Sequence, residues 1–178
     1  MGNDGAPVVS PVLKKKRGGL ELTLSTEERD LLRALQTELR ALYEAGPDDA
    51  DPIRSRLFPR AYLDPTAEDA EREWRELVHP ELVRDRMAAL DQLLASLEPT
   101  PGARGRIVLT LEGESIDALL SVLNDARLAL GTRLGVTDDI DDDELYPDHP
   151  LAPEIAVYSW LTYLEGLLVD TLLGDMPD

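Results

Sequence analysis

The chain has 178 residues, enough for one domain with a hydrophobic core, and its hydrophobic share of 43% argues against wholesale disorder. Its formal net charge of −18 repels polyanions, so nucleic acid is disfavoured as a partner. The absence of cysteine excludes disulfides, thiol catalysis and thiolate metal sites, and it fits a cytoplasmic location.

The N-terminal residues 1–17 are expected to form a flexible arm, because they contain scattered glycines and prolines. The arm ends in the basic run from Lys14 to Arg17, for which a solvated segment is favoured over a DNA contact. Residues 18–175 are expected to form a single domain. No segment of the sequence has the pattern of a signal peptide, and the longest apolar helix, near the C-terminus, carries Glu165 and Asp170 and is not expected to span a membrane.

A short strand and a long helix are predicted next. Residues 20–24 alternate apolar and polar side chains, which is typical of a half-buried strand. Ser25 and Glu28 have the spacing of a capping box, so a helix should begin here, and leucines at helical spacing continue it to about Ala45.

The middle of the sequence predicts irregular chain followed by two helices. Residues 46–52 read as a loop, and residues 53–63 as an irregular segment or short helical turn interrupted by a proline. Helices are then expected over 67–78 and 80–97. Pro80 suits the first position of the second helix, which favours a break or sharp kink over one straight helix.

A second strand–helix unit follows a loop over residues 98–105. Residues 106–111 read as a strand, and residues 112–134 as a helix that Gly135 would cap. Because an isolated strand leaves its backbone groups unpaired, this strand is expected to pair with residues 20–24 as a small ribbon.

The last predicted element is a helix over residues 153–173, after an acidic loop over residues 138–144. Its wide apolar face suggests a central helix or one shared with a second subunit. The predicted fold is therefore mainly α (α+β in detail): a compact bundle of about five helices with a small two-stranded β ribbon.

No motif for a catalytic, metal or cofactor site is found, so none of these sites is expected. Alternating aspartates at 139, 141 and 143 begin like a calcium loop, but the required glycine and final glutamate are replaced by Glu144 and Pro150. His79 and His149 lie far apart in the sequence and have no ligand-cluster spacing.

Arg127 is the most informative charged residue. Helical spacing places it within an apolar face, where an unpaired guanidinium would cost several kcal/mol. Glu165, at the edge of the last helix's apolar stripe, is the first candidate partner. A structural ion pair is favoured over a ligand-binding arginine. Asn124 would flank Arg127 and could form a hydrogen bond with a neighbouring backbone group or with a ligand. Trp160 is the fourth candidate binding residue, and its simplest interpretation is a core residue.

Three segments carry a resemblance to a known family: RLFPRAY at 56–62, NDARLALGTRLGV at 124–136 and VYSWLTYLEGLLV at 157–169. They resemble the actinobacterial domain-of-unknown-function family 2017 (DUF2017), and the likeness covers residues 17–173. The resemblance implies an actinobacterial cytoplasmic protein, usually encoded near the ClpS protease adaptor and without an agreed activity. Some members carry a label as transcriptional regulators, and the family supplies no catalytic residues.

The leading functional hypothesis is a non-enzymatic protein-interaction or regulatory module, because catalytic motifs are missing and the protein is acidic. A protein partner or self-association is expected, and a homodimer through the last helix is one form of it. One alternative is a transcriptional regulator that uses the basic N-terminal arm. The other is a small anionic-ligand-binding protein or enzyme centred on Arg127.

Overall fold

A computed structural model describes residues 11–98, 106–136 and 150–174. In chain order the elements are β1 (Val12–Lys16), β2 (Gly19–Leu24), α1 (Thr26–Ala45), α2 (Pro52–Leu57), η1 (Pro65–Ala67), α3 (Glu68–Ser96), β3 (Ile107–Leu111), α4 (Glu114–Leu134) and α5 (Ala152–Leu173). The fold is mainly α with a small antiparallel sheet, which confirms the predicted class.

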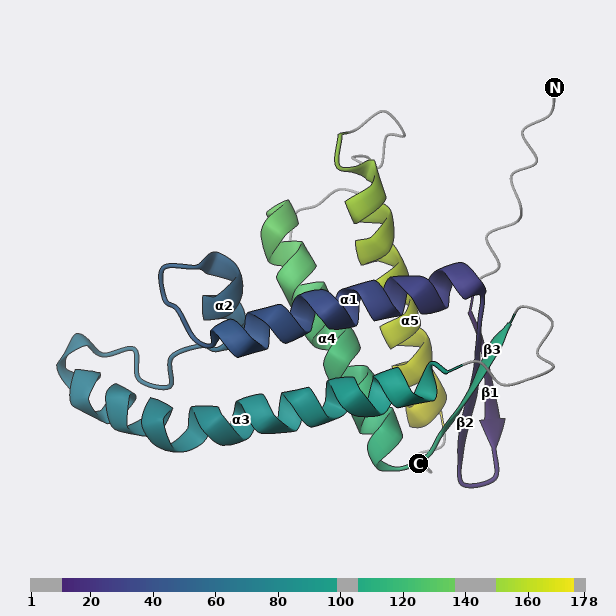
Figure 1. The fold of residues 1–178 in the computed structure, drawn as a ribbon, viewed down its shortest axis with the longest axis horizontal. Coiled ribbons are helices and arrows are strands. Elements are labelled where there is room, and N and C mark those ends of the chain that lie inside the picture. The colour runs from purple at the N-terminus through teal and green to yellow at the C-terminus, as the bar shows by residue number, and fades with distance from the viewer. Residues whose placement is uncertain (1–10, 99–105, 137–149, 175–178) are drawn as a thin grey trace.

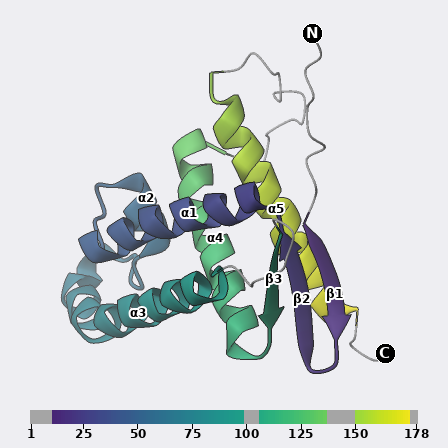
Figure 2. The same ribbon diagram turned by 45° about the vertical axis from the view of Figure 1, so that its right-hand side comes forward.

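The helices form two crossed layers. Helices α1 and α3 lie side by side in one layer, and α4 and α5 cross behind them in the other (Figure 1). The sheet stands at one end of the bundle, and in the turned view α5 passes behind its strands (Figure 2). The short helix α2 packs against α4.

One leucine-rich core joins all of these elements. The sheet, α1, α3, α4 and α5 each contribute a leucine whose side chain is 0% exposed: Leu22, Leu32, Leu90, Leu123 and Leu164. Burial of each such side chain is worth about 2 kcal/mol relative to its exposure to water. The core therefore needs few aromatic side chains, because leucine side chains fill the space between the layers.

The predicted pairing of the two strands is confirmed. Strands β2 and β3 are antiparallel neighbours, with Leu22 opposite Leu109. Both strands alternate buried and more exposed residues, so their leucine faces point into the core. The alternation that predicts each strand also sets its register, since a shift by one residue would turn the leucines outward.

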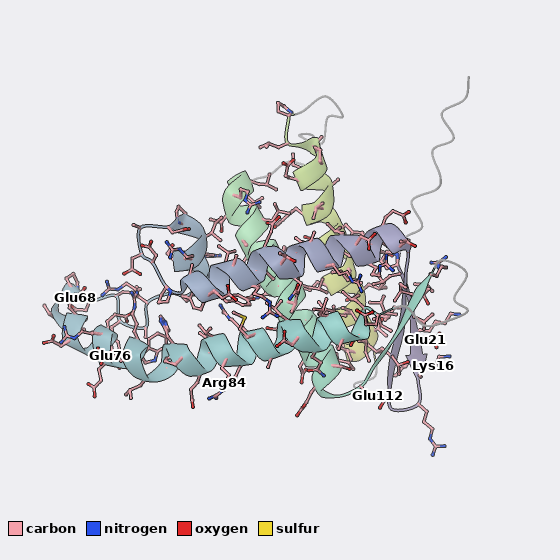
Figure 3. All side chains as sticks on the ribbon, in the orientation of Figure 1. Lys16, Glu21, Glu68, Glu76, Arg84 and Glu112 are labelled. Atoms are coloured by element: carbon pink, nitrogen blue, oxygen red, sulfur yellow. The ribbon has the colours of Figure 1, made fainter. Side chains whose placement is uncertain are left out.

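The predicted two-stranded ribbon and the arm boundary at residue 17 need correction, because β1 adds a third strand. Strand β1 pairs antiparallel with β2 through a tight turn in which Gly18 has φ 89°. Lys16 lies beside Glu21 with 3.3 Å between Nζ and Oε2 (Figure 3). Successive lysines are typical of a solvated arm, but they also occur on edge strands. On an edge strand their charge discourages pairing with other chains. Residues 1–10 lie outside the described part.

Helix α1 begins as predicted. Oγ of Ser25 accepts a hydrogen bond from the amide of Glu28 at 3.1 Å, and the Glu28 carboxylate accepts one from the amide of Ser25 at 2.7 Å. The helix ends at Ala45, as the leucine spacing indicates.

The predicted break at Pro80 is wrong. Helix α3 continues from Glu68 to Ser96 with Pro80 in its interior, and its ribbon is curved along its length (Figure 1). A proline inside a helix removes one hydrogen bond and crowds the preceding turn, which bends a helix without ending it. Leu77 is 68% exposed, because the N-terminal part of α3 extends beyond the core leucines of the bundle.

Helices α4 and α5 form an antiparallel pair, and both occupy the predicted ranges closely. Gly135 caps α4 in the left-handed conformation with φ 69°, as predicted. Helix α5 is not central, because only Leu161, Leu164 and Leu168 are fully buried on it. None of the described helices combines the length and apolar composition needed to span a membrane.

Candidate functional site

The predicted contact between Arg127 and Glu165 is present. Nη1 of Arg127 on α4 lies 2.6 Å from Oε2 of Glu165 on α5, and the two side chains are 31% and 18% exposed. The pair therefore lies at the rim of the α4–α5 interface and not deep in the interior. Ala126 and Ala129 take the inward positions on this part of α4. Ion pairing of these helices is consistent with a structural role for Arg127.

Trp160, another predicted residue, makes its contact away from Arg127. Nε1 of Trp160 donates a hydrogen bond to Oε1 of Glu28 at 3.1 Å, so Trp160 fastens α5 to the beginning of α1. Asn124 is half-buried on α4. The structure brings together Arg127 and Glu165 and places Trp160 in a separate contact between α1 and α5.

Sequence reasoning missed a buried polar cluster next to this region. Asp125 is 3% exposed, and its Oδ2 accepts a hydrogen bond from the Tyr43 hydroxyl at 2.5 Å. Nε of Arg86 lies 3.4 Å from the same oxygen. Burial raises the pKa of Asp125, although the hydrogen bond from Tyr43 and the charge of Arg86 act to lower it. Burial also raises the pKa of Tyr43, and the neighbouring Asp125 carboxylate adds to that increase. Asp125 follows Val122 by three residues and precedes Ala129 by four, so helical periodicity places it on the same face as these apolar residues. This spacing could have identified Asp125 as a buried residue from the sequence.

Arg86 also fixes the end of α2. Its Nη1 donates to the carbonyl oxygen of Leu57 at 2.8 Å, and its guanidinium lies 4.9 Å from the centre of the Phe58 ring. Phe58 is 0% exposed. One guanidinium thus connects α3, the core of the bundle and the RLFPRAY segment through an ion pair, a carbonyl contact and a cation–π contact.

Glu71 holds the following part of the same segment. Its Oε2 accepts hydrogen bonds from the amides of Ala61 and Tyr62 at 3.0 and 2.9 Å, and its Oε1 accepts one from Nε of Arg75 at 2.6 Å. Burial acts to raise the pKa of Glu71, but these hydrogen bonds outweigh burial and lower it. The chain between α2 and α3 is therefore held by a carboxylate that is ionised at neutral pH.

His79 lies in the interior of α3, buried to 5% exposure between the rings of Phe58 and Trp74. Burial lowers its pKa, so the imidazole is neutral at pH 7. Within residues 11–98, 106–136 and 150–174, no three acidic or histidine side chains gather as a metal site. The aspartates of the calcium-like pattern at 139–143 and His149 lie outside those ranges.

A cleft of about 680 Å³ adjoins the Arg127–Glu165 pair. Arg56 of α2 and Tyr158 of α5 line two sides of it, and α4 lines the third with side chains from Arg127 to its C-terminal cap. Gly131 allows Tyr158 to approach α4 closely, because a Cβ at position 131 would lie 3.0 Å from Cε2 of the tyrosine ring. The cleft combines two guanidinium groups with an aromatic side chain.

A family model described as "Domain of unknown function (DUF2017)" matches residues 10–172. The chain belongs to the DUF2017 family. The match begins before β1 and ends within the last turn of α5, so the DUF2017 domain includes the third strand.

Relatives of this DUF2017 chain occur in mycobacteria, which agrees with the predicted actinobacterial family. The chain is 36% identical over 135 residues to the oxidative stress regulator AosR of Mycobacterium tuberculosis. It is 37% identical over 135 residues to the putative oxidative stress regulator AosR of Mycobacterium leprae. Each alignment covers 70% of this chain and 59% of the relative, so less than two thirds of those proteins is matched. No solved structure matches the chain.

Proposed function

We propose that this DUF2017 protein is a regulatory module that acts in the cytoplasm by binding another protein, without catalysing a reaction. The observation that carries the proposal is the similarity to two proteins named as oxidative stress regulators. The proposed setting is therefore a response to oxidants. The described side chains support the non-enzymatic part, because the buried carboxylates of Glu28, Glu71 and Asp125 are engaged in contacts that hold helices and loops together.

The chemistry of the sequence limits how such a module would work. The 178 residues contain no cysteine, so peroxide cannot act here by converting a thiol to a sulfenic acid or a disulfide. With thiol chemistry excluded and only three methionines in the chain, the proposed oxidant signal arrives through the partner or through the abundance of this protein. Binding of a protein partner is therefore the central activity in the proposal.

DNA binding by the basic run is the second reading, and its support is the regulator name of the relatives. Lys14 and Lys16 lie on an edge strand, and Lys16 is paired with Glu21, which reduces the charge available for phosphates. Anisotropy of a labelled genomic fragment at low salt tests this reading. We expect no binding by the wild type or by a Lys14, Lys15 and Lys16→Gln triple variant. Salt-dependent binding that the triple variant loses would favour the DNA reading instead.

Deletion of the gene tests the main proposal. We expect the deletion strain to show an altered transcript response to hydrogen peroxide, and the tagged chain to capture the same protein reproducibly before or after treatment. Re-expression of the wild-type chain should restore the response. An unchanged peroxide response in the deletion strain would contradict the proposal.

A further inference from the structure

The cleft beside Arg127 is formed by the three segments that carry the family resemblance. Arg56 comes from RLFPRAY, the α4 wall comes from residues 127–136, and Tyr158 comes from the third segment. We propose that this cleft receives a carboxylate side chain from an acidic segment of a protein partner. This inference rests on the proposed function and deepens it, because it specifies the chemistry by which the partner is recognised.

Arg56 is the first reason. Its neighbours in the chain are engaged: Arg54 pairs with Asp51 at 3.0 Å, and Arg60 pairs with Glu68 at 2.6 Å. Arg56 is exposed and makes no hydrogen bond or ion pair with any residue in the described part of the chain. Its free guanidinium can bind a carboxylate through two parallel hydrogen bonds.

Arg127 is the second reason. A guanidinium has five N–H donors, and the contact with Glu165 places Nη1 2.6 Å from its Oε2. The side chain is 31% exposed and lines the cleft. Arg127 can therefore keep its ion pair with Glu165 and still donate to an incoming carboxylate.

The charges around the cleft favour an anion. Among the described residues, two arginines line the cleft, and one carboxylate, that of Glu165, pairs with one of them. The C-terminal end of α4 opposes this with roughly half a negative charge. That effect is reduced here, because the amides of Gly135 and Val136 donate to the carbonyls of Thr132 and Gly131 at 3.2 and 2.9 Å.

The shape of the cleft favours a side chain on a partner protein over a small molecule. A small-molecule pocket encloses most of its ligand, whereas Arg56 and Gly135 at this rim are both exposed. Leu128 and Val136 provide apolar contacts beside the arginines. An acidic side chain flanked by apolar residues would use both kinds of contact.

Three probes test the assignment by backbone-amide chemical shifts of the full chain. The first is a synthetic peptide in which three glutamates alternate with leucines, the second replaces each glutamate with glutamine, and the third is glutarate. We expect saturable shifts at residues 128–136 with the glutamate peptide, and weaker binding of the other two. Equal binding of the glutamine peptide, shifts elsewhere, or no saturation would overturn the proposal. Equal or tighter binding of glutarate would replace it with a small-carboxylate site.

Matched arginine variants locate the binding. Arg56→Gln should weaken the glutamate peptide roughly fivefold, the loss expected for one partly exposed charge pair. Arg127→Lys, which keeps the charge but not the planar donors, should also weaken it. Arg84→Gln is the control, because Arg84 is an exposed arginine on the outer side of α3 (Figure 3). Equal affinity of the Arg56→Gln variant and wild type would overturn the assignment.

The cellular readout separates this inference from the function on which it rests. Cells that carry Arg56→Gln in place of the wild type should show a weakened peroxide response. If deletion of the gene alters the response and Arg56→Gln does not, the regulatory function stands and the cleft assignment fails. If deletion has no effect, the regulatory function itself fails, whatever the peptide titration gives.

Discussion

Asp125 is a single residue on which three helices depend. It lies on α4, receives a hydrogen bond from Tyr43 of α1 and pairs with Arg86 of α3. A buried charge is costly in isolation, and these two donors offset that cost. Since Arg86 also binds the carbonyl of Leu57, the loss of Asp125 would be felt at α2 as well.

Replacement of Asp125 by alanine should be strongly destabilising. Removal of one partner from a buried pair leaves the other uncompensated, so we expect a loss of about 3 kcal/mol in the free energy of unfolding. Asp117→Ala on the exposed side of the same helix should cost less than about 1 kcal/mol. Urea unfolding followed by circular dichroism compares the two variants. Equal losses would show that the cluster has no special role.

Glu71 should make stability depend on pH with a definite sign. Its folded-state pKa lies below the usual 4.5, so its contribution is present above that pH and is lost as the pH falls through the folded-state value. Asp125 acts in the opposite direction, because its raised pKa makes protonation easier in the folded state. Glu71→Gln should therefore be less stable than wild type at pH 7, and the difference should shrink between about pH 5 and about pH 3. Urea unfolding at several pH values measures this difference, and a constant gap would contradict the assignment.

At the scale of elements, local signals predict most of the fold. The Ser25–Glu28 spacing predicts the start of α1, and alternating leucines predict the pairing of β2 with β3. Strand β1 escapes prediction because its three lysines hide an edge strand whose outer face is solvated. The continuity of α3 through Pro80 is missed because contacts of both halves of that helix, through Glu71 before Pro80 and Arg86 after it, outweigh one lost hydrogen bond.

Two glycine substitutions should change stability in opposite directions. Gly135→Ala forces alanine into the left-handed cap of α4 and should cost about 1 kcal/mol. Gly166→Ala lies inside α5, where a new Cβ meets nothing within 4 Å, and the higher helix propensity of alanine should gain roughly 0.5–1 kcal/mol. Thermal and urea unfolding of both variants measures the signs. A loss at Gly166 would mean that another surface lies close to α5.

At the scale of the whole molecule, α5 is unusually apolar for an outer helix. Tyr163 is 50% exposed, Leu173 is 55% exposed and Val169 is 37% exposed, all on this helix. Apolar residues around an entire helix are typical of one that is covered on several sides. The expectation of a homodimer through the last helix therefore stays a prediction with a defined surface.

Light scattering coupled to size-exclusion chromatography tests that surface. We expect a dimer for the wild type and a monomer for Tyr163→Glu, because a carboxylate in the centre of an apolar interface would lack a partner. Leu63→Glu is the control, since Leu63 is an apolar residue 82% exposed outside α5. A monomeric wild type would end this reading of α5.

The candidate site is only partly predictable from sequence. Helical periodicity and the need to pair a guanidinium predict the contact between Arg127 and Glu165. Periodicity cannot tell which way Arg56 faces, because α2 is short and its position depends on Arg86 and Glu71, far along the chain. The contribution of Asp125 is hidden by the same dependence on distant helices.

The anchoring of the chain between α2 and α3 has a consequence for the integrity of the molecule. Leu63 is 82% exposed, so a protease can reach this connection, yet Phe58 before it is 0% exposed and Glu71 after it holds the amides of Ala61 and Tyr62. A single cut after Leu63 would yield two pieces that still share one hydrophobic interior. The nicked protein should therefore persist as a non-covalent complex, and the separately produced fragments should reassemble when mixed.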